Sequence, residues 1–479
     1  MTEKIKKLIP KKIFKALQPT YHFLLSFLAA VIYFFPSRKL IVVGVTGTAG
    51  KTSTAYLIKK VFEQAGYKTG LTSTAIFSDG NKEWLNDKKM TMPGRFFIQK
   101  ILKQMVKNGC CYAIVETTSE GIKQFRHRFI NYDTLVFTGL YPEHIEAHGS
   151  FEKYKEAKGK LFAHLKHFKN KYIDENKKVC AVKNGLKKLE RERVKKTIIV
   201  NGDDEQADYF LNFWSEVKII YSFNPELELE KVTKNLSSES LVKEMFLVKA
   251  EFKNEEEGDL SGVKFAIGSE NFNLQLLGNF NALNALAAYC VALSHGLNKE
   301  TIKLGLESVT SLAGKMELIK EGQNFIAMVD YSFEPKALEK LYETIKAIPY
   351  RRLIHILGST GGGRDKSRRP ILGRLAAERA QIVIITNEDP YDEEPAQIIN
   401  QVAAGAEMAG KIKDKNLFKI LDRREAIKKA LELAQEDDLV LLTGKGAEQY
   451  ICLARGQKMP WDDREELRRA IVDKMCIDK

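Results

Sequence analysis

A glycine-rich turn between a buried strand and a helix is the feature of this 479-residue chain that most restricts its fold. The apolar run "KLIVVGV" predicts a buried strand, and "TSTAYLIKKVFEQAG" predicts a helix that ends at Gly66. The glycines of the connecting "TGTAGK" allow backbone N–H groups to converge on phosphate oxygens at the start of the helix. The stretch from Gly44 to Thr54 therefore predicts a phosphate loop inside a βαβ unit.

The residue types in this loop suit the phosphates of ATP and a Mg²⁺ ion. Lys51 would neutralise the β- and γ-phosphates, and the Thr52 hydroxyl, with Ser53 nearby, would reach Mg²⁺. The spacing departs from the commonest phosphate loop, because Val45 stands where a first glycine is usual. We expect ATP to be bound in this loop by Gly47, Thr48, Ala49, Gly50, Lys51, Thr52 and Ser53.

Strands and helices alternate along most of the chain, which predicts the α/β class with mostly parallel sheets. "YAIVET" and "TLVFTGL" predict further buried strands after the loop. Four apolar runs then follow Gly314, namely "FIAMVDY", "LIHILGS", "QIVIITN" and "DLVLLTG". We expect a P-loop central domain over residues 39–312 and a smaller Rossmann-like α/β C-terminal domain over residues 313–479.

Residues 1–38 form a basic and hydrophobic segment of a different character. Residues 21–36 have almost no polarity, but these 16 residues are short for a membrane span, which needs about 20. An interfacial anchor and a hydrophobic docking helix are both compatible with this pattern. Peripheral membrane contact through residues 1–36 is therefore one of two alternatives.

The overall composition limits the classes of partner and the cellular compartment that we expect for this protein. A net charge of +14 favours anionic partners, but the lysines are scattered and no nucleic-acid recognition motif is present, so we expect no nucleic-acid partner. The six cysteines lack metal-site or redox spacing, which fits a reducing cytoplasm. We expect a cytoplasmic monomer, at the inner face of the plasma membrane if the N-terminal segment is an anchor.

A lysine stands on the apolar face of a predicted helix. The stretch "GSFEKYKEAKGKLF" predicts a helix after Gly149 whose apolar residues, from Phe151 to Phe162, share one face. Lys158 occupies the remaining position on that face. Its ammonium could reach out to water along a packed stem, or it could be buried for a chemical reason.

The loop and several later segments resemble the Mur ligase family, the ATP-dependent amide ligases of peptidoglycan synthesis, in order from about residue 39 to 455. The C-terminal segments are similar to the tripeptide synthetase branch, the MurE type. The similar segments are "VETTSEG", "FTGLYPEHIEAHGSFEKYKEAKGKLF", "GNFNALNALAA", "AGKMELI", "VDYSFEP", "GSTGGGRDKSRRPILG", "TNEDPYDEEP" and "LLTGKGAEQY".

The resemblance implies a metal-assisted catalytic site. Glu116 and His144 would bind Mg²⁺, and Lys158 falls where the family has a lysine carbamylated by CO₂, 14 residues after His144. Two Mg²⁺ ions are implied. The implied catalytic residues are Lys51, Glu116, His144 and Lys158, and the implied metal ligands are Thr52, Glu116, His144 and Lys158 as its carbamate.

The resemblance also implies contacts to the other substrates. Asn281, Lys315 and Asp330 would join the loop in binding ATP. The implied contacts to the acceptor and the incoming amino acid are Thr91, Met92, Thr118, Ser119, Arg364, Asp389, Tyr391, Gly444 and Glu448.

The implied reaction begins when ATP phosphorylates a carboxylate of a UDP-MurNAc-L-Ala-D-Glu-type precursor. The amine of a free amino acid then displaces phosphate and becomes the third residue of the peptide, a diamino acid. Two alternatives remain open. One is a related ligase that acts on a lipid-linked or other carboxylate acceptor, such as a folylpolyglutamate-type substrate. The other is a non-catalytic ATP-binding scaffold.

The sequence departs from the family in its specificity segments. The usual N-terminal domain that holds UDP has no counterpart ahead of residue 39, which leaves open a nucleotide-linked or a lipid-linked precursor. In "NEDPY", Asp389 and Tyr391 replace the asparagine and arginine typical of diaminopimelate enzymes. The acidic pair Glu388–Asp389 would suit an amine-rich substrate such as lysine, or it forms a solvated acidic loop. Ala447 and Phe333 replace two histidines of the family.

Overall fold

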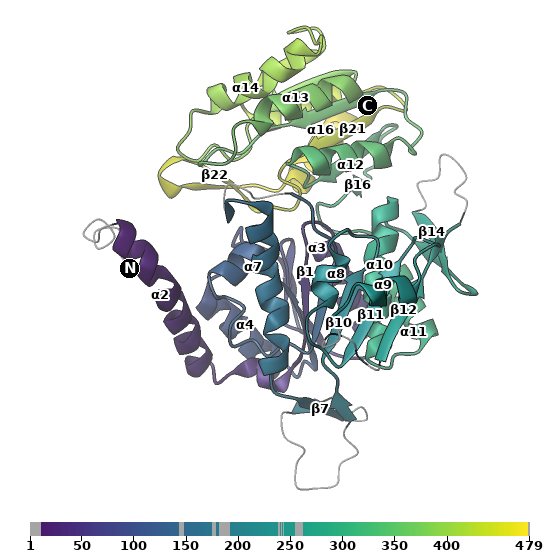
Figure 1. Cartoon of the computed structure of the whole chain (residues 1–479). Helices are drawn as coiled ribbons and strands as arrows, with labels where there is room; N and C mark the ends of the chain where they lie inside the picture. Colours follow the sequence, from purple (N-terminus) through teal and green to yellow (C-terminus); the bar gives the residue numbers. More distant parts are fainter. Residues whose placement is uncertain are drawn as a thin grey trace.

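The computed structural model describes residues 11–142, 148–174, 179–181, 192–237, 240, 242, 244–253 and 262–477. These residues form two α/β bodies, with the phosphate-loop strand β1 in the middle of the larger one (Figure 1). The α/β fold class that the alternating pattern predicts is confirmed.

The larger sheet has nine strands among the described residues, in the order β12-β11-β10-β6-β1-β5-β2-β3-β4. Pairing is parallel from β12 to β2 and antiparallel for β2–β3 and β3–β4. Parallel strands are covered on both faces, which explains their continuous apolar runs. The strands are β1 (Ile41–Thr46), β2 (Thr69–Thr72), β3 (Ile76–Ser78), β4 (Glu83–Leu85), β5 (Tyr112–Glu116), β6 (Thr134–Phe137), β10 (Thr197–Asn201), β11 (Val217–Ser222) and β12 (Glu244–Lys249).

Helices bury both faces of this sheet. One face packs against α3 (Lys51–Gln64), α10 (Asn279–Ser294) and α11 (Lys299–Glu307). The helices of the other face are α4 (Arg95–Lys107), α5 (Ser119–Lys123), α7 (Phe151–Ala163), α8 (Ala207–Leu211) and α9 (Leu229–Lys234). Two small antiparallel sheets flank the body, with strands β7 (Lys171–Asp174), β8 (Val179–Ala181), β9 (Glu192–Val194), β13 (Glu251–Phe252), β14 (Val263–Ile267) and β15 (Glu270–Leu274).

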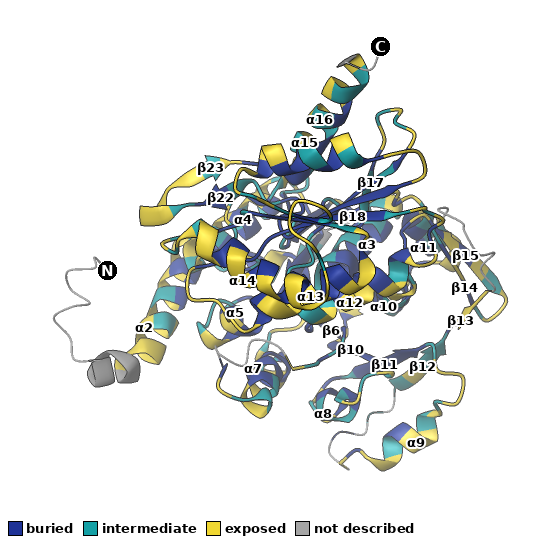
Figure 2. Cartoon of the chain, turned by 90° about the horizontal axis from the view of Figure 1, so that it is seen from above, coloured by how far each residue is buried: buried dark blue, intermediate teal, exposed yellow. Residues whose placement is uncertain are grey.

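The second body is built on a six-stranded sheet in the order β16-β17-β21-β18-β19-β20. Its pairs are parallel except β16–β17. Helices α12, α13 and α14 cover one face, and α15 and α16 cover the other (Figure 2). The bounds are β16 (Glu317–Ile319), β17 (Ile326–Asp330), β18 (Leu353–Leu357), β19 (Ile382–Thr386), β20 (Leu417–Ile420), β21 (Leu439–Thr443), β22 (Tyr450–Cys452), β23 (Lys458–Pro460), α12 (Pro335–Ile345), α13 (Arg368–Arg379), α14 (Pro395–Met408), α15 (Arg423–Leu433) and α16 (Asp463–Ile477).

The N-terminal segment forms helix α2 (Lys11–Ile32) and a short 3-10 turn, η1 (Pro36–Lys39), at the edge of the larger body (Figure 1). The helix buries its small residues Ser26, Ala29 and Ala30 and leaves large apolar side chains exposed. None of the helices in the described ranges combines the length and apolarity that crossing a bilayer requires.

Candidate active site

The phosphate loop is enclosed by two other segments. Helix α3 starts directly after Gly50, whose φ of 79° lies in the left-handed region. A Cβ on Gly50 would lie 2.4 Å from Asn284 Oδ1, and a Cβ on Gly47 would lie 2.0 Å from Thr138 Oγ1. Thr138 also donates to the Ala49 carbonyl at 2.6 Å. The glycines are therefore required by the close approach of α10 and the end of β6.

The charged and hydroxyl groups of the loop point to a compact polar site. Lys51 Nζ folds back onto the Thr48 carbonyl at 2.7 Å. Thr48 Oγ1 lies 3.2 Å from the Tyr154 hydroxyl of α7. These contacts hold the two residues beside the N-terminus of α3, where an anion is favoured by unpaired N–H groups and the helix dipole.

The Glu116 carboxylate, at the end of β5, joins the loop to a neighbouring turn. It accepts hydrogen bonds from Thr52 Oγ1 at 3.0 Å, from Thr74 N at 2.7 Å and from Thr74 Oγ1 at 2.9 Å. The Thr74 hydroxyl lies 2.7 Å from that of Thr91. Glu116 is 1% exposed, so a carboxylate and a hydroxyl meet in a site shielded from water. This oxygen set fits Mg²⁺, a hard cation.

Lys158 is buried in α7 and reaches the same loop. Ser150 caps the helix by accepting from Lys153 N, and Lys158 is 1% exposed. Its Nζ donates to the Gly47 carbonyl at 2.7 Å and lies 4.7 Å from the Tyr154 ring centroid. The alternative of an ammonium reaching out to water is therefore wrong for this residue.

The expected metal ligand His144 lies outside the described residues, so its role and its spacing to Lys158 stay a prediction. The next histidine along the chain, His148, lies within the described residues. It is buried, and its Nε2 lies 3.1 Å from the Ser119 hydroxyl. Thr118, next to Ser119, caps α5 by accepting from Gly121 N.

The residues expected to bind the rest of ATP lie on both bodies. Asn281 is buried in the first turn of α10 and accepts from Asn284 Nδ2 at 3.0 Å. In the second body, the Asp330 carboxylate accepts from Met316 N at 2.9 Å, which fixes the connection between the bodies. Lys315 Nζ lies 4.5 Å from the Tyr331 ring centroid.

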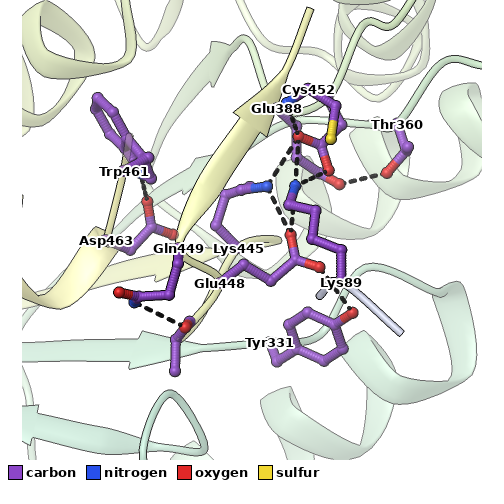
Figure 3. Close-up of polar contacts among 12 residues, drawn as sticks. Lys89, Tyr331, Thr360, Glu388, Lys445, Glu448, Gln449, Cys452, Trp461 and Asp463 are labelled. Atoms are coloured by element: carbon purple, nitrogen blue, oxygen red, sulfur yellow. Dashed lines mark hydrogen bonds and ion pairs between the residues drawn. The ribbon is translucent and has the colours of Figure 1, made fainter. Parts of the chain in front are cut away.

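The C-terminal residues that we expected to contact the amino acid lie in a buried charge cluster (Figure 3). Asp389 pairs with Lys445 at 2.9 Å and with Lys89 at 2.7 Å. Glu448 pairs with the same two lysines, at 2.6 and 3.1 Å, and accepts from the Tyr331 hydroxyl at 3.3 Å. Burial alone would raise the pKa of Asp389, but Lys445 and Lys89 outweigh it and hold that pKa below its usual value.

Of the two interpretations of Glu388–Asp389, the solvated acidic loop is wrong. Glu388 is 3% and Asp389 5% exposed, because β19 delivers them into the protein rather than to its surface. Glu388 accepts from Thr360, and burial raises the pKa of its carboxyl group. The pKa of Asp389 is thus lowered, whereas that of Glu388 is raised. Asp389 belongs to the lysine cluster.

Three further expected residues are placed around this cluster. Gly444 N donates to the Asp330 carbonyl at 3.2 Å, and a Cβ on Gly444 would lie 2.6 Å from Glu388 Oε2. Tyr391, with φ of 51°, donates its N–H to the Cys452 carbonyl at 3.1 Å. Arg364 is exposed on the loop before α13, in which Gly361 N donates to the Asp389 carbonyl at 2.8 Å.

Several site residues were not expected from the sequence. Thr74 follows β2 in an ordinary polar turn, and Lys89 stands in a lysine-rich stretch, so neither carries a local signal. Lys445 lies between two glycines directly after the buried strand β21, and that position could have identified it.

Two family models match this chain. The Mur ligase middle domain matches residues 45–210, and the glutamate ligase domain of Mur ligases matches residues 314–446. A UDP-N-acetylmuramyl-tripeptide synthetase of Roseiflexus sp. (strain RS-1) is 34% identical over 463 residues, which cover 95% of this chain and 83% of that relative. A UDP-N-acetylmuramoyl-L-alanyl-D-glutamate–2,6-diaminopimelate ligase of Geobacillus kaustophilus (strain HTA426) is 32% identical, covering 94% and 82%.

Solved structures agree with this assignment. A UDP-N-acetylmuramoyl-L-alanyl-D-glutamate–2,6-diaminopimelate ligase structure superposes with a TM-score of 0.55 at 26% identity, over 91% of this chain and 79% of that chain. A Mycobacterium tuberculosis folylpolyglutamate synthase shares the fold, with a TM-score of 0.61 at 14% identity, over 90% and 96%. The chain therefore belongs to the Mur ligase family of ATP-dependent acid–amino-acid ligases.

Proposed function

We propose that this protein adds an amino acid, the third residue, to a UDP-MurNAc-L-Ala-D-Glu-type precursor. The observation that carries the proposal is the convergence of the phosphate loop, Glu116 and buried Lys158 in one hydrogen-bonded site. A scaffold that only bound ATP would gain nothing from burying a lysine there, since burying an ammonium costs free energy.

The proposed reaction consists of two successive displacements. A carboxylate oxygen of the acceptor attacks the γ-phosphorus of ATP and ADP leaves, which gives an acyl phosphate. The neutral amine of the amino acid then attacks the acyl carbon, phosphate leaves with that carboxylate oxygen, and the new amide loses a proton. In our proposal Lys51 and the N–H groups of the loop stabilise the transferring phosphoryl group.

Mur ligases use ATP and Mg²⁺. We propose that Thr52 and Glu116 hold Mg²⁺, with His144 and Lys158 completing two ion sites. Bound Mg²⁺ would supply charge neutralisation at the phosphate oxygens. The hydrogen bond between Thr52 and Glu116 supports this, because it holds two oxygen ligands together beside the phosphate loop.

We propose that Lys158 acts as a carbamate. The ammonium would first lose one proton, and the neutral amine would then add to CO₂ and release a second proton. The two steps turn a cation into an anion that can hold a metal ion. The nitrogen of a carbamate keeps one hydrogen. That hydrogen can still donate to the Gly47 carbonyl, so the contact at 2.7 Å is compatible with the modified side chain.

For the incoming amino acid, we propose that Asp389 and Glu448 face its distal ammonium group, with Tyr391, Gly444 and Arg364 around it. Tyr391 supports lysine over diaminopimelate, because a phenol replaces the arginine that would pair with a distal carboxylate. Thr91, Met92, Thr118 and Ser119 are proposed to face the acceptor, since they lie around Glu116 and α5. The acceptor is nucleotide-linked in this proposal, and a lipid-linked one is the alternative.

We also propose that α2 rests on an anionic membrane surface. Leu24, Leu28 and Phe34 are 57%, 47% and 78% exposed, whereas the helix buries small residues, the reverse of a helix that faces a protein core. Lys103 Nζ lies 5.5 Å from the Phe34 ring centroid. No acidic residue occurs between positions 3 and 63 or within α4. The positive charge of the lysine and arginine residues in these segments therefore complements anionic lipid.

The substrate assignment predicts ATP-dependent ligation by the purified full chain. UDP-MurNAc-L-Ala-D-Glu with Mg²⁺, ATP and L-lysine should yield ADP, phosphate and a tripeptide product resolved by mass spectrometry. Diaminopimelate, glutamate, alanine and ammonia serve as competing amines, and undecaprenyl-linked precursor and a folate as competing acceptors. Turnover with none of the UDP-linked acceptors would contradict the proposal.

If Lys158 acts as a carbamate, a small carboxylate should restore activity to a variant that lacks this lysine. Lys158→Ala should lower kcat by about 10²–10³-fold, the range for removal of one charge-stabilising group. Acetate, a small carboxylate, should restore part of the activity in this variant. Lys160→Ala, an exposed lysine of the same helix, is the matched control and should retain wild-type activity. Full activity of Lys158→Ala without acetate would exclude the carbamate.

The membrane proposal predicts lipid-dependent sedimentation. The protein should pellet with vesicles of phosphatidylglycerol and phosphatidylcholine and remain soluble with phosphatidylcholine alone. Leu24→Ser with Leu28→Ser should weaken binding at least about tenfold, because each buried leucine contributes about 1.5–3 kcal/mol. Met408→Ser, at another site that is 87% exposed, is the control. Equal pelleting of all three proteins would refute the lipid-binding face.

A further inference from the structure

We propose that Lys89 is a built-in competitor of the incoming amino acid: its ammonium occupies the position of a substrate ammonium at Asp389 and Glu448 and fastens the two bodies together. The substrate part of this inference rests on the proposed function. The fastening part rests on the contacts alone.

The contacts of Lys89 cross from one body to the other. Lys89 follows β4 of the nine-stranded sheet, whereas Asp389, Glu448 and Lys445 follow β19 and β21 of the six-stranded sheet. Its Nζ lies 2.9 and 2.7 Å from the two Asp389 oxygens and 3.1 Å from Glu448 Oε2. The Lys89 side chain is 8% exposed, and its ammonium points into the cluster of Lys445 and Glu448 (Figure 3). A lysine of one body thus fills an acidic site in the other.

Lys89 occupies both carboxylate oxygens of Asp389. One of its oxygens already accepts from Lys89, from Lys445 at 2.9 Å and from Cys452 N at 2.7 Å, and the other accepts from Lys89. A substrate ammonium can take the position between Asp389 and Glu448 only when Lys89 leaves it. Lys445 is a poor candidate to leave, because its side chain is fully buried within the same body as Asp389.

The charges favour such an exchange. Asp389 and Glu448 carry two negative charges and Lys445 one positive charge, so these three residues of the second body together carry a net charge of −1. Lys89 brings this to zero. A buried net negative charge attracts an ammonium strongly, because the low-dielectric surroundings screen it weakly. When the bodies separate, the vacated position therefore favours a cationic side chain and disfavours a neutral one of the same shape.

The loop that carries Lys89 is held in place at both ends. Asn86 Nδ2 donates to the carbonyls of Ser73 and Met90, at 2.9 and 3.1 Å. Lys89 itself has a φ of 51°, in the left-handed region that is strained for a residue with a side chain. The ion pairs stabilise this strained conformation.

The same loop also reaches the proposed metal site. Thr91 lies 2.7 Å from Thr74, which donates to Glu116. Removal of Lys89 from Asp389 is thus mechanically linked to the carboxylate proposed to hold Mg²⁺.

The test compares Lys89→Met with Lys88→Met, a neighbouring lysine that is 39% exposed and pairs with Asp87. The dissociation constants of L-lysine and of L-norleucine, which has a similar shape without the ammonium, are measured by calorimetry on the full chain. Lys89→Met should bind L-lysine at least about tenfold more tightly and leave norleucine unchanged. Small-angle scattering should show a larger radius of gyration for this variant than for wild type.

Lys89→Arg keeps the positive charge and should behave as wild type in both measurements, which separates loss of charge from loss of folding. Weaker L-lysine binding by Lys89→Met would overturn the proposal, as would equal changes in Lys88→Met or an unchanged radius of gyration. Neither measurement needs turnover, so a failure of the ligase assignment would appear in the ligation assay and not here.

Discussion

The crowding around Gly47 is the constraint on which the remaining site depends. Its carbonyl accepts from buried Lys158, and its Cα lies so close to Thr138 that no side chain fits. The Lys158 nitrogen can donate to this carbonyl as an amine or as a carbamate, and a buried polar group without a partner is costly, so α7 and the phosphate loop stabilise each other's position. The loop is therefore preorganised before ATP arrives, and preorganised donors are what stabilise a transferring phosphoryl group.

From this loop a chain of contacts runs into the second body. Thr52 reaches Glu116, Glu116 reaches Thr74, and the segment from Thr91 back to Lys89 ends at Asp389. Each contact joins segments that are distant in sequence, and the last one, Lys89–Asp389, depends on how the two bodies are arranged. With the amino acid bound at Asp389 as we propose, closure of the two bodies would bring it to the phosphate position and exclude water from an acyl phosphate.

The sequence predicts the local features well and the long-range ones poorly. The strand before the loop and the apolar face around Lys158 follow from periodicity, because burial there is a property of neighbouring residues. Lys89 and Asp389 are 300 positions apart, and no local pattern announces their pairing. The sequence leaves a solvated loop open as one of two interpretations of Glu388–Asp389 for the same reason: the partners that make burial of Asp389 tolerable, Lys89 and Lys445, lie in other segments.

The central claim is that ATP activates a carboxylate as an acyl phosphate, and oxygen transfer tests it most directly. UDP-MurNAc-L-Ala-D-Glu labelled with ¹⁸O in its free carboxylates is incubated with the protein, ATP, Mg²⁺ and L-lysine, and the released phosphate is analysed by mass spectrometry. The account predicts one ¹⁸O in each phosphate released, because the carboxylate oxygen leaves with it. Phosphate free of ¹⁸O would mean that water receives the phosphoryl group, and would contradict the ligase mechanism.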